Sequence, residues 1–168
     1  MDIGIGTGTL SYKLYSKGMK ITGLDFPNEM LRILRKKMPN AKLYLVDIKN
    51  GFPDIISNER YDFIISSYTL HHLEMEEKTV FINQLSRLLT NGGTIIIENV
   101  SFESQSDLEK CKSEVEDSGE LWDYEEEPDY TVWEKHEDLF NNYNVFYEQV
   151  SICASIIMLT LKDLTNPL

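Results

Sequence analysis

The order of apolar and amphipathic segments constrains the fold of this chain more than any other feature of its sequence. Short runs that are apolar almost throughout alternate with segments whose apolar residues recur at helical spacing. Strands of that kind are typical of a parallel sheet that helices cover on both faces. The expected strands are residues 1–5, 20–24, 42–46, 61–66 and 94–100, and the expected helices are residues 9–17, 29–37 and 77–89.

The pattern changes at the end of the chain. Residues 144–149 and 155–161 both have β character and lie close together, so a hairpin can join them. We therefore expect an antiparallel pair at one edge of the sheet. Asn91-Gly92-Gly93 is a predicted turn ahead of the fifth strand. A chain of 168 residues fits one domain, so the sequence predicts a single α/β domain over residues 1–168.

A glycine-rich loop follows the first expected strand. Gly4, Gly6 and Gly8 stand between that strand and the first expected helix. Glycine lets the backbone adopt positive φ and approach a ligand closely, and the helix behind the loop presents unpaired N–H groups at its N-terminus. The loop therefore predicts a site for a nucleotide-like cofactor, although NAD-binding folds use a similar loop.

Carboxylates end the next two strands. Asp25 follows the second strand, where a carboxylate can accept hydrogen bonds from both hydroxyls of a ribose, as in NAD enzymes. Asp47 follows the third strand, where an acidic acceptor suits the exocyclic amine of adenine. Open α/β sheets bind ligands at these carboxyl ends, but both residues also suit ordinary turns. Thr9 occupies the third position of the dinucleotide fingerprint, where NAD-binding folds have glycine or alanine.

Taken in order, these segments resemble the motifs of class I S-adenosylmethionine-dependent methyltransferases. The resemblance rests on DIGIGTG at residues 2–8, ITGLD ending at Asp25, LVDI around Asp47, YDFIISSYTLHHL at residues 61–73 and LLTNGGTIII at residues 88–97. The closing stretch FYEQVSICASIIMLTLK is similar to the last strand pair of small bacterial members. The resemblance covers nearly the whole chain. It implies a Rossmann-like, doubly wound sheet of seven strands, mostly parallel with an antiparallel last strand.

The resemblance also implies an activity and a cofactor. The activity is methyl transfer from S-adenosylmethionine to a small molecule with an O, N or C nucleophile. The implied cofactor-binding residues are Asp2, Gly4, Gly6 and Gly8 for the methionine and ribose part, Asp25 for the ribose hydroxyls, Phe26, Met30, Asp47 and Ile48 for the adenine, and Ser66 near the reacting methyl. A loop cap is the alternative role for Asp2, and the helix core is the alternative place for Met30.

Three residues after the fourth strand are candidates for a catalytic role. His71 or His72 can act as a general base if the acceptor must lose a proton, since histidine titrates near neutral pH. The favoured alternative is that the pair begins a helix, with one ring packed and one solvated. For Tyr68, a place in a pocket wall is favoured over a role as a catalytic phenol. The sequence assigns no catalytic residue firmly and predicts no metal site.

Two other functions stay open. An NAD-dependent oxidoreductase would share the loop and Asp25, but Thr9 and the position of Asp47 argue against it. The second is a catalytically silent binding or interaction protein with the same fold. Because Met1 directly precedes Asp2, the first strand is truncated compared with family members and their upstream helices are missing. We therefore expect a shortened chain that binds cofactor weakly or not at all.

The net charge of −12 is confined to one segment. Residues 103–138 hold 15 acidic and 3 basic side chains, whereas the rest of the chain has 13 of each. The chain lacks the basic face that nucleic acids require. We expect residues 101–138 to be an insertion between strands five and six, on the substrate side. Its carboxylates, with Trp122, Tyr124 and Trp133, suit a cationic amine, although a solvated helical face is favoured.

The remaining sequence features concern the cellular location of the protein. No apolar run reaches the roughly 20 residues that a membrane span needs, and a glycine-rich loop stands where a signal peptide would begin. We therefore expect a cytoplasmic protein that acts on a small molecule without contacting membranes. Cys111 and Cys153 lie far apart in sequence and are predicted to be free thiols. The sequence carries no signal of oligomeric state.

Overall fold

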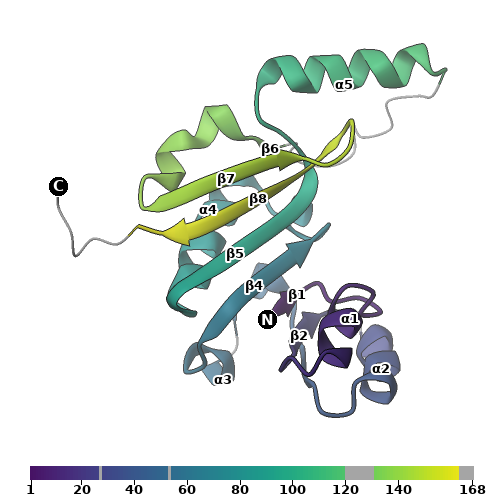
Figure 1. The fold of residues 1–168 in the computed structure, drawn as a ribbon, viewed down its shortest axis with the longest axis vertical. Helices are drawn as coiled ribbons and strands as arrows, with labels where there is room; N and C mark the ends of the chain where they lie inside the picture. Colours follow the sequence, from purple (N-terminus) through teal and green to yellow (C-terminus); the bar gives the residue numbers. More distant parts are fainter. Residues whose placement is uncertain (27, 53, 120–130, 163–168) are drawn as a thin grey trace.

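A mixed sheet organises the chain. The computed structural model describes residues 1–26, 28–52, 54–119 and 131–162. Within them the strands follow the order β3-β2-β1-β4-β5-β8-β7, with β6 paired to β5 off that path (Figure 1). The strands are β1 (Asp2–Ile3), β2 (Thr22–Asp25), β3 (Lys42–Leu45), β4 (Tyr61–Ser67), β5 (Leu89–Phe102), β6 (Thr131–Val132), β7 (Tyr143–Gln149) and β8 (Ala154–Leu161). The helices are α1 (Ser11–Ser16), α2 (Asn28–Lys37), α3 (Asp54–Ser57), α4 (Met75–Ser86) and α5 (Gln105–Asp117), with short 3-10 helices η1 (Ile48–Asn50), η2 (Leu70–His72) and η4 (Trp133–Phe140).

The strand directions confirm the predicted topology. From β3 to β5 all neighbours are parallel, whereas β8 is antiparallel to β5 and β7 is antiparallel to β8. A tight turn joins β7 to β8, in which the N–H groups of Val150 and Ser151 both donate to the carbonyl of Ala154. The predicted hairpin is therefore present. The prediction omitted β6, because a strand of 2 residues leaves no recognisable pattern in the sequence.

Two apolar clusters lie on opposite faces of the sheet. Leu24 of β2 belongs to a cluster that includes Phe81 of α4. Its neighbour Gly23 faces the other way, because a Cβ there would lie 2.6 Å from the side chain of Ile5. Ile5 in turn packs with Leu34 of α2 in the second cluster. Helices therefore pack on both sides of the sheet around β1 and β2, as a doubly wound fold requires.

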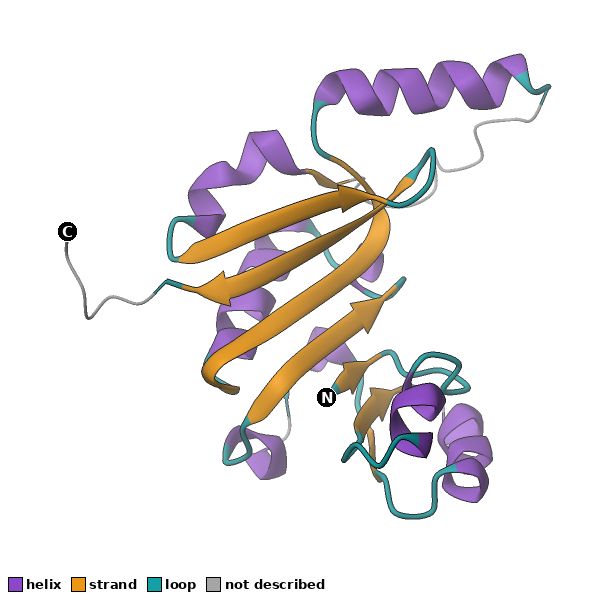
Figure 2. Ribbon diagram, viewed as in Figure 1, coloured by secondary structure: helices purple, strands orange, loops and turns teal. Residues whose placement is uncertain are grey.

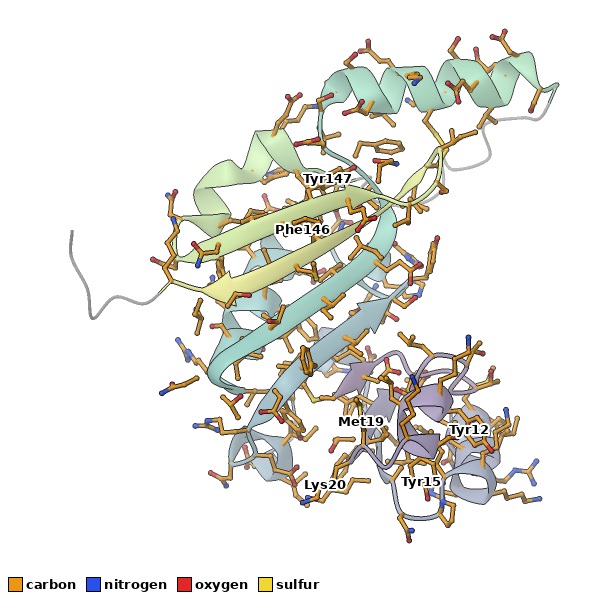
Figure 3. All side chains as sticks on the ribbon, viewed as in Figure 1. Tyr12, Tyr15, Met19, Lys20, Phe146 and Tyr147 are labelled. Atoms are coloured by element: carbon orange, nitrogen blue, oxygen red, sulfur yellow. A yellow bond between two sulfur atoms is a disulfide. The ribbon has the colours of Figure 1, made fainter. Side chains whose placement is uncertain are left out.

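One face of β4, β5, β8 and β7 is open. Figure 2 shows none of the described helices in front of these strands. Phe63 and Phe146, the latter labelled in Figure 3, share this face through the strand register and are 54% and 50% exposed. Ile64 points to the opposite face and is fully buried. Among the described residues, the packed core of this half of the sheet therefore lies only on the face that carries α4.

The fifth strand begins earlier than predicted. β5 starts at Leu89 and contains Asn91-Gly92-Gly93, which the sequence suggested was a separate turn. The register with β4 shifts between Tyr61 and Phe63, opposite this stretch, and Gly92 has a φ of 75°. The glycines are therefore accommodated as an irregularity inside the strand, so the predicted turn was wrong.

A disulfide joins Cys111 of α5 to Cys153 in the β7–β8 turn. Their Cα atoms are 5.8 Å apart although the residues are separated by 42 positions in sequence. The prediction of two free thiols was wrong. Leu108 of α5 packs with Phe102 at the end of β5, and this contact brings α5 beside the turn that carries Cys153. Only the tertiary packing reveals that proximity.

The acidic segment of residues 101–138 lies partly outside the described residues. Its described helix, α5, buries only Leu108 and Cys111, which agrees with a largely solvated helical face. Trp122 and Tyr124 fall outside the described residues. Trp133 is described, and it is buried at the start of η4. In the part of the chain that the structure describes, no helix has the length and apolar character needed to cross a membrane.

Candidate functional site

The glycine-rich loop starts at the centre of the sheet. β1 lies between β2 and β4, so Ile3 is paired with Leu24 on one side and with Ser66 on the other. The N–H groups of Gly4 and Ile5 both donate to the carbonyl of Leu24, at 2.9 and 3.0 Å. These bonds hold the loop at the carboxyl ends of β2 and β4, where the sequence predicted a ligand site.

All three loop glycines have positive φ: 69° at Gly4, 56° at Gly6 and 74° at Gly8. Two of them also sit in tight space. A Cβ on Gly4 would lie 1.8 Å from Thr69 Oγ1, and a Cβ on Gly8 would lie 2.4 Å from Leu34 Cδ2. A Cβ on Gly6 would approach nothing nearer than the Gly4 carbonyl oxygen, at 3.9 Å. Gly4 and Gly8 thus serve close packing, whereas Gly6 borders open space that a ligand can occupy.

The Asp25 carboxylate faces this loop from the end of β2. The backbone N–H of Gly6 donates to Oδ2, and the N–H of Phe26 donates to Oδ1 at 2.6 Å. Both carboxylate oxygens are therefore fixed in position. A carboxylate has about four lone-pair sites, so Asp25 retains the capacity to accept bonds from two hydroxyl groups of a ligand.

Asp2 is the buried acid of the site. It is 4% exposed, and Ser11 Oγ donates to its Oδ2 at 2.6 Å. Burial raises the pKa of Asp2 from 3.8 to about 6, although the Ser11 bond acts in the opposite direction. Through this bond Asp2 connects β1 to the first residue of α1. The contacts match the loop-cap alternative, and the predicted contact with a methionine amino group remains a proposal.

Asp47 caps the turn that follows β3. Its Oδ1 accepts from the N–H of Lys49 and its Oδ2 accepts from Asn50 Nδ2, both at 3.0 Å. This bonding is that of an ordinary turn residue. Ile48, the next residue, lines a cavity of about 450 Å³ whose other wall includes Phe81 of α4. The structure thus places Asp47 and Ile48 after β3 as predicted, beside a cavity.

Phe26 and Met30 lie beyond the end of β2 and at the start of α2. They are 63% and 36% exposed, and the buried residues of α2 are Leu31 and Leu34. Met30 therefore does not belong to the helix core, which was the alternative placement for it. Both side chains have surface with which to contact a planar base.

The chain turns sharply after β4. Tyr68 has a φ of 49°, a conformation that costs energy for a residue with a side chain and that recurs at functional sites. Thr69 Oγ1 lies 3.3 Å from the carbonyl oxygen of Ile3 and 3.1 Å from that of Ser67, which ties the turn to β1. Ser66 is 1% exposed, and its Oγ has no hydrogen-bond partner among the described residues. An unsatisfied hydroxyl therefore borders the loop.

The two histidines have different surroundings. His71 is partly buried, and its Nδ1 lies 3.3 Å from Oδ1 of Asn99 in β5. His72 is exposed, and the two rings are in edge contact with centroids 4.1 Å apart. Asn99 is itself buried, so it can fix the orientation of His71 with Nδ1–H as the donor. Tyr68 is 47% exposed, as a residue of a pocket wall can be.

The comparison with known families decides what kind of domain this is. Residues 1–93, which include the loop, both strand-end carboxylates and the turn after β4, match the family model described as a methyltransferase domain. The chain belongs to this methyltransferase family. The structural features of the site therefore lie within the segment that defines the methyltransferase domain.

The methyltransferase domain also has curated relatives. It is 31% identical over 116 residues to an uncharacterized methyltransferase of Alkaliphilus oremlandii, covering 69% of this chain and 52% of the relative. It is 30% identical over 154 residues to an uncharacterized methyltransferase of Staphylococcus carnosus, covering 89% of this chain and 71% of the relative. The chain thus spans about half the length of several relatives that it matches.

Solved structures share the fold of the domain. A Pyrococcus horikoshii protein superimposes with a TM-score of 0.72 at 18% identity, covering 96% of this chain and 80% of that chain. The plantazolicin methyltransferase BpumL, in complex with a pentazolic desmethylPZN analog and SAH, superimposes with a TM-score of 0.69 at 19% identity, covering 96% of this chain and 76% of that chain. At these identities the likeness establishes the Rossmann-like fold.

Sequence reasoning missed three residues that organise the methyltransferase site. Ser11 bonds to Asp2, Thr69 packs against Gly4, and Asn99 contacts His71. Ser11 and Thr69 had a weak sequence signal, since Ser11 closely follows the glycine-rich loop and Thr69 lies within the segment at residues 61–73. Asn99 had none, because it meets His71 only through the pairing of β4 with β5.

Proposed function

We propose that this methyltransferase domain transfers a methyl group from S-adenosylmethionine to a small-molecule acceptor, and that residues 1–168 act as one domain. The observation that carries the proposal is the Asp25 carboxylate, fixed at the end of β2 and facing the loop glycine that borders open space. Solved complexes of similar fold support it, since BpumL and DhpI were each crystallised with SAH.

The residues present fit this cofactor. Asp25 accepts bonds from the ribose hydroxyls, and Gly6 lets the backbone approach the ribose and methionine part. Phe26 and Met30 contact the adenine, while Asp47 and the N–H of Ile48 bind its edge. The orphan hydroxyl of Ser66 donates to a polar group of the methionine end, which removes the cost of its burial. Gly4, Gly8 and Asp2 hold the loop in the shape that these contacts need.

The chemistry asks mainly for positioning. The sulfonium supplies an activated methyl and a good leaving group, so transfer is an in-line displacement. This chain's residues orient the acceptor and exclude water around it. Where the acceptor must lose a proton, His71 is a better base than His72, because Asn99 orients its ring. Tyr68, which lies at this turn with a positive φ, forms part of the wall around the acceptor.

The test is calorimetric titration with S-adenosylhomocysteine. Asp25→Asn keeps the size of the side chain but removes its charge, so we expect binding to weaken by at least about tenfold, the loss of one charged hydrogen bond. Asp117→Asn makes the same change on the exposed end of α5 and should leave affinity unchanged. Equal affinity for wild type and Asp25→Asn would overturn the proposed site.

A further inference from the structure

A second cavity lies at the edge of the sheet, between η4 and β7. Its volume is about 510 Å³, within the range of small-molecule sites. Figure 1 shows η4, the light green helical segment before β7, beside that strand. We call this space the β7 cavity and define it by six of its lining residues: Glu103, Trp133, Glu134, Phe140, Tyr143 and Tyr147.

Aromatic rings form a continuous wall of the β7 cavity. The ring centroids of Trp133 and Phe140 are 5.3 Å apart, and those of Phe140 and Tyr143 are 6.4 Å apart, both in edge arrangements. All three residues are over nine-tenths buried. The indole Nε1 of Trp133 has no hydrogen-bond partner among the described residues. A wall of packed rings offers π-faces, which attract organic cations once water is excluded.

The charged groups of the cavity are separated along β7. Glu103 and Glu134 are held together where β5 leads into α5, because the N–H of Glu134 donates to the carbonyl of Glu103 at 3.0 Å. Glu103 and Tyr147 both line this cavity, and burial raises the pKa of Tyr147 above its usual range. Figure 3 shows Tyr147 on β7. This end of the cavity is therefore acidic.

The other end carries the opposite charge. Lys162 also lines the cavity, and its Nζ donates to the carbonyl of Asn141 at 2.9 Å, close to Tyr143. Tyr143 and Tyr147 are four positions apart on β7, which is about 13 Å in a strand. An amine in the cavity is consequently drawn to the glutamates and repelled from the lysine end. The arrangement gives a ligand one preferred orientation.

The β7 cavity is separate from the glycine-loop site. Ser66, Ile97, Ile157 and Tyr147 occupy one row across β4, β5, β8 and β7. The cavity lining reaches Ile157 in this row, which lies two strand spacings, or about 10 Å, from Ser66. The buried Ile97 lies between Ile157 and Ser66, so a small ligand in the cavity does not contact Ser66, and we expect it to bind independently of methyl transfer.

We propose that the β7 cavity is a second binding site, for a small organic cation with an aromatic or apolar body and a protonated amine. The body lies against Trp133, Phe140 and Tyr143, and the amine points to Glu103 and Glu134. Lys162 excludes the reverse orientation. The site has no role in the transfer step and takes its ligand whether or not the loop site is filled.

A matched pair of probes tests the charge requirement. Phenethylamine and 3-phenylpropionate have the same aromatic body with opposite charge, and each is titrated calorimetrically into the full chain. We expect phenethylamine to bind at least about tenfold more tightly. Saturating S-adenosylhomocysteine should leave this affinity unchanged. Equal binding of the two probes, binding of neither, or competition by S-adenosylhomocysteine would each overturn the proposal.

Variants locate the probe. Glu103→Gln removes one charge from an exposed position and should weaken phenethylamine binding by at least about threefold. Glu116→Gln makes the same change on the exposed surface of α5, outside the cavity lining, and should have no effect. Trp133→Leu, checked for folding by circular dichroism, should also weaken binding. An equal effect of Glu103→Gln and Glu116→Gln would show that the amine responds only to net charge.

Discussion

At the scale of single residues, Asp2 gives a pH dependence. Its raised pKa, about 6 against an ordinary 3.8, means that the folded state holds this proton more tightly than the unfolded state. The stability of the fold therefore falls as pH rises from about 4 to 6, by roughly 3 kcal/mol from this group. Urea unfolding of wild type and Asp2→Asn across that range should show the decline in wild type only. Parallel pH profiles for the two proteins would contradict the assignment.

Gly8 gives a prediction about packing. Gly8→Ala must accept both positive φ and a Cβ 2.4 Å from Leu34, so we expect it to lose about 3 kcal/mol of unfolding free energy. Gly18 is a matched control, with a φ of 87° and nothing within 4 Å of a Cβ. Gly18→Ala should lose only about 1 kcal/mol, the cost of the backbone conformation. Equal losses of unfolding free energy for Gly8→Ala and Gly18→Ala in denaturant unfolding would show that Leu34 moves to make room for the new Cβ, and would contradict this prediction.

The sequence predicted some of these residues better than others. The places of Asp25 and Asp47 after their strands were predictable, because each ends an apolar strand that runs into a turn, and their contacts with a ligand remain a prediction. Ser11 and Thr69 were not, since a hydroxyl next to a motif has many possible partners. The lack of a hydrogen-bond partner for Ser66 Oγ among the described residues was likewise not predictable from the sequence, because it depends on which groups the fold brings near.

At the scale of elements, the disulfide stabilises the attachment of α5. Closing a loop between residues 42 positions apart is worth about 4 kcal/mol in the chain-entropy model. Reduction should therefore lower the unfolding free energy by roughly 2–4 kcal/mol and reduce hydrogen-exchange protection in α5 while β4 stays protected. Titration of two free thiols in the native, unreduced protein would contradict this. The predicted free thiols had supported the expectation of a reducing cytoplasm. The disulfide removes that support, and the cytoplasmic location remains a prediction.

The elements that escaped prediction did so for physical reasons. α5 is dense in charge and buries only Leu108 and Cys111, so its helical periodicity is weak. The start of β5 was assigned to a turn because Asn91-Gly92-Gly93 is a strong turn signal, which the pairing with β4 overrides. By contrast, β4 and the β7–β8 hairpin carry long apolar runs and were predicted correctly.

At the scale of the whole molecule, strand direction followed from sequence pattern and family resemblance, whereas the strand order comes from the structure. The open face of β4, β5, β8 and β7, with Phe63 and Phe146 exposed, did not, because periodicity says which residues are apolar and not what covers them. The loop site also has a feature that sequence lacks. Gly6 N–H donates to Asp25, so a ligand shares the acceptor sites of this carboxylate with the loop backbone. The expected weak binding of cofactor remains a prediction.

The most direct test of the central claim is a calorimetric comparison of S-adenosylhomocysteine with NAD on the wild-type chain. We predict saturable binding of S-adenosylhomocysteine and no binding of NAD. Tight binding of S-adenosylhomocysteine would refute only the expectation of weak affinity. Binding of neither compound, or preference for NAD, would contradict the assignment of this site to S-adenosylmethionine.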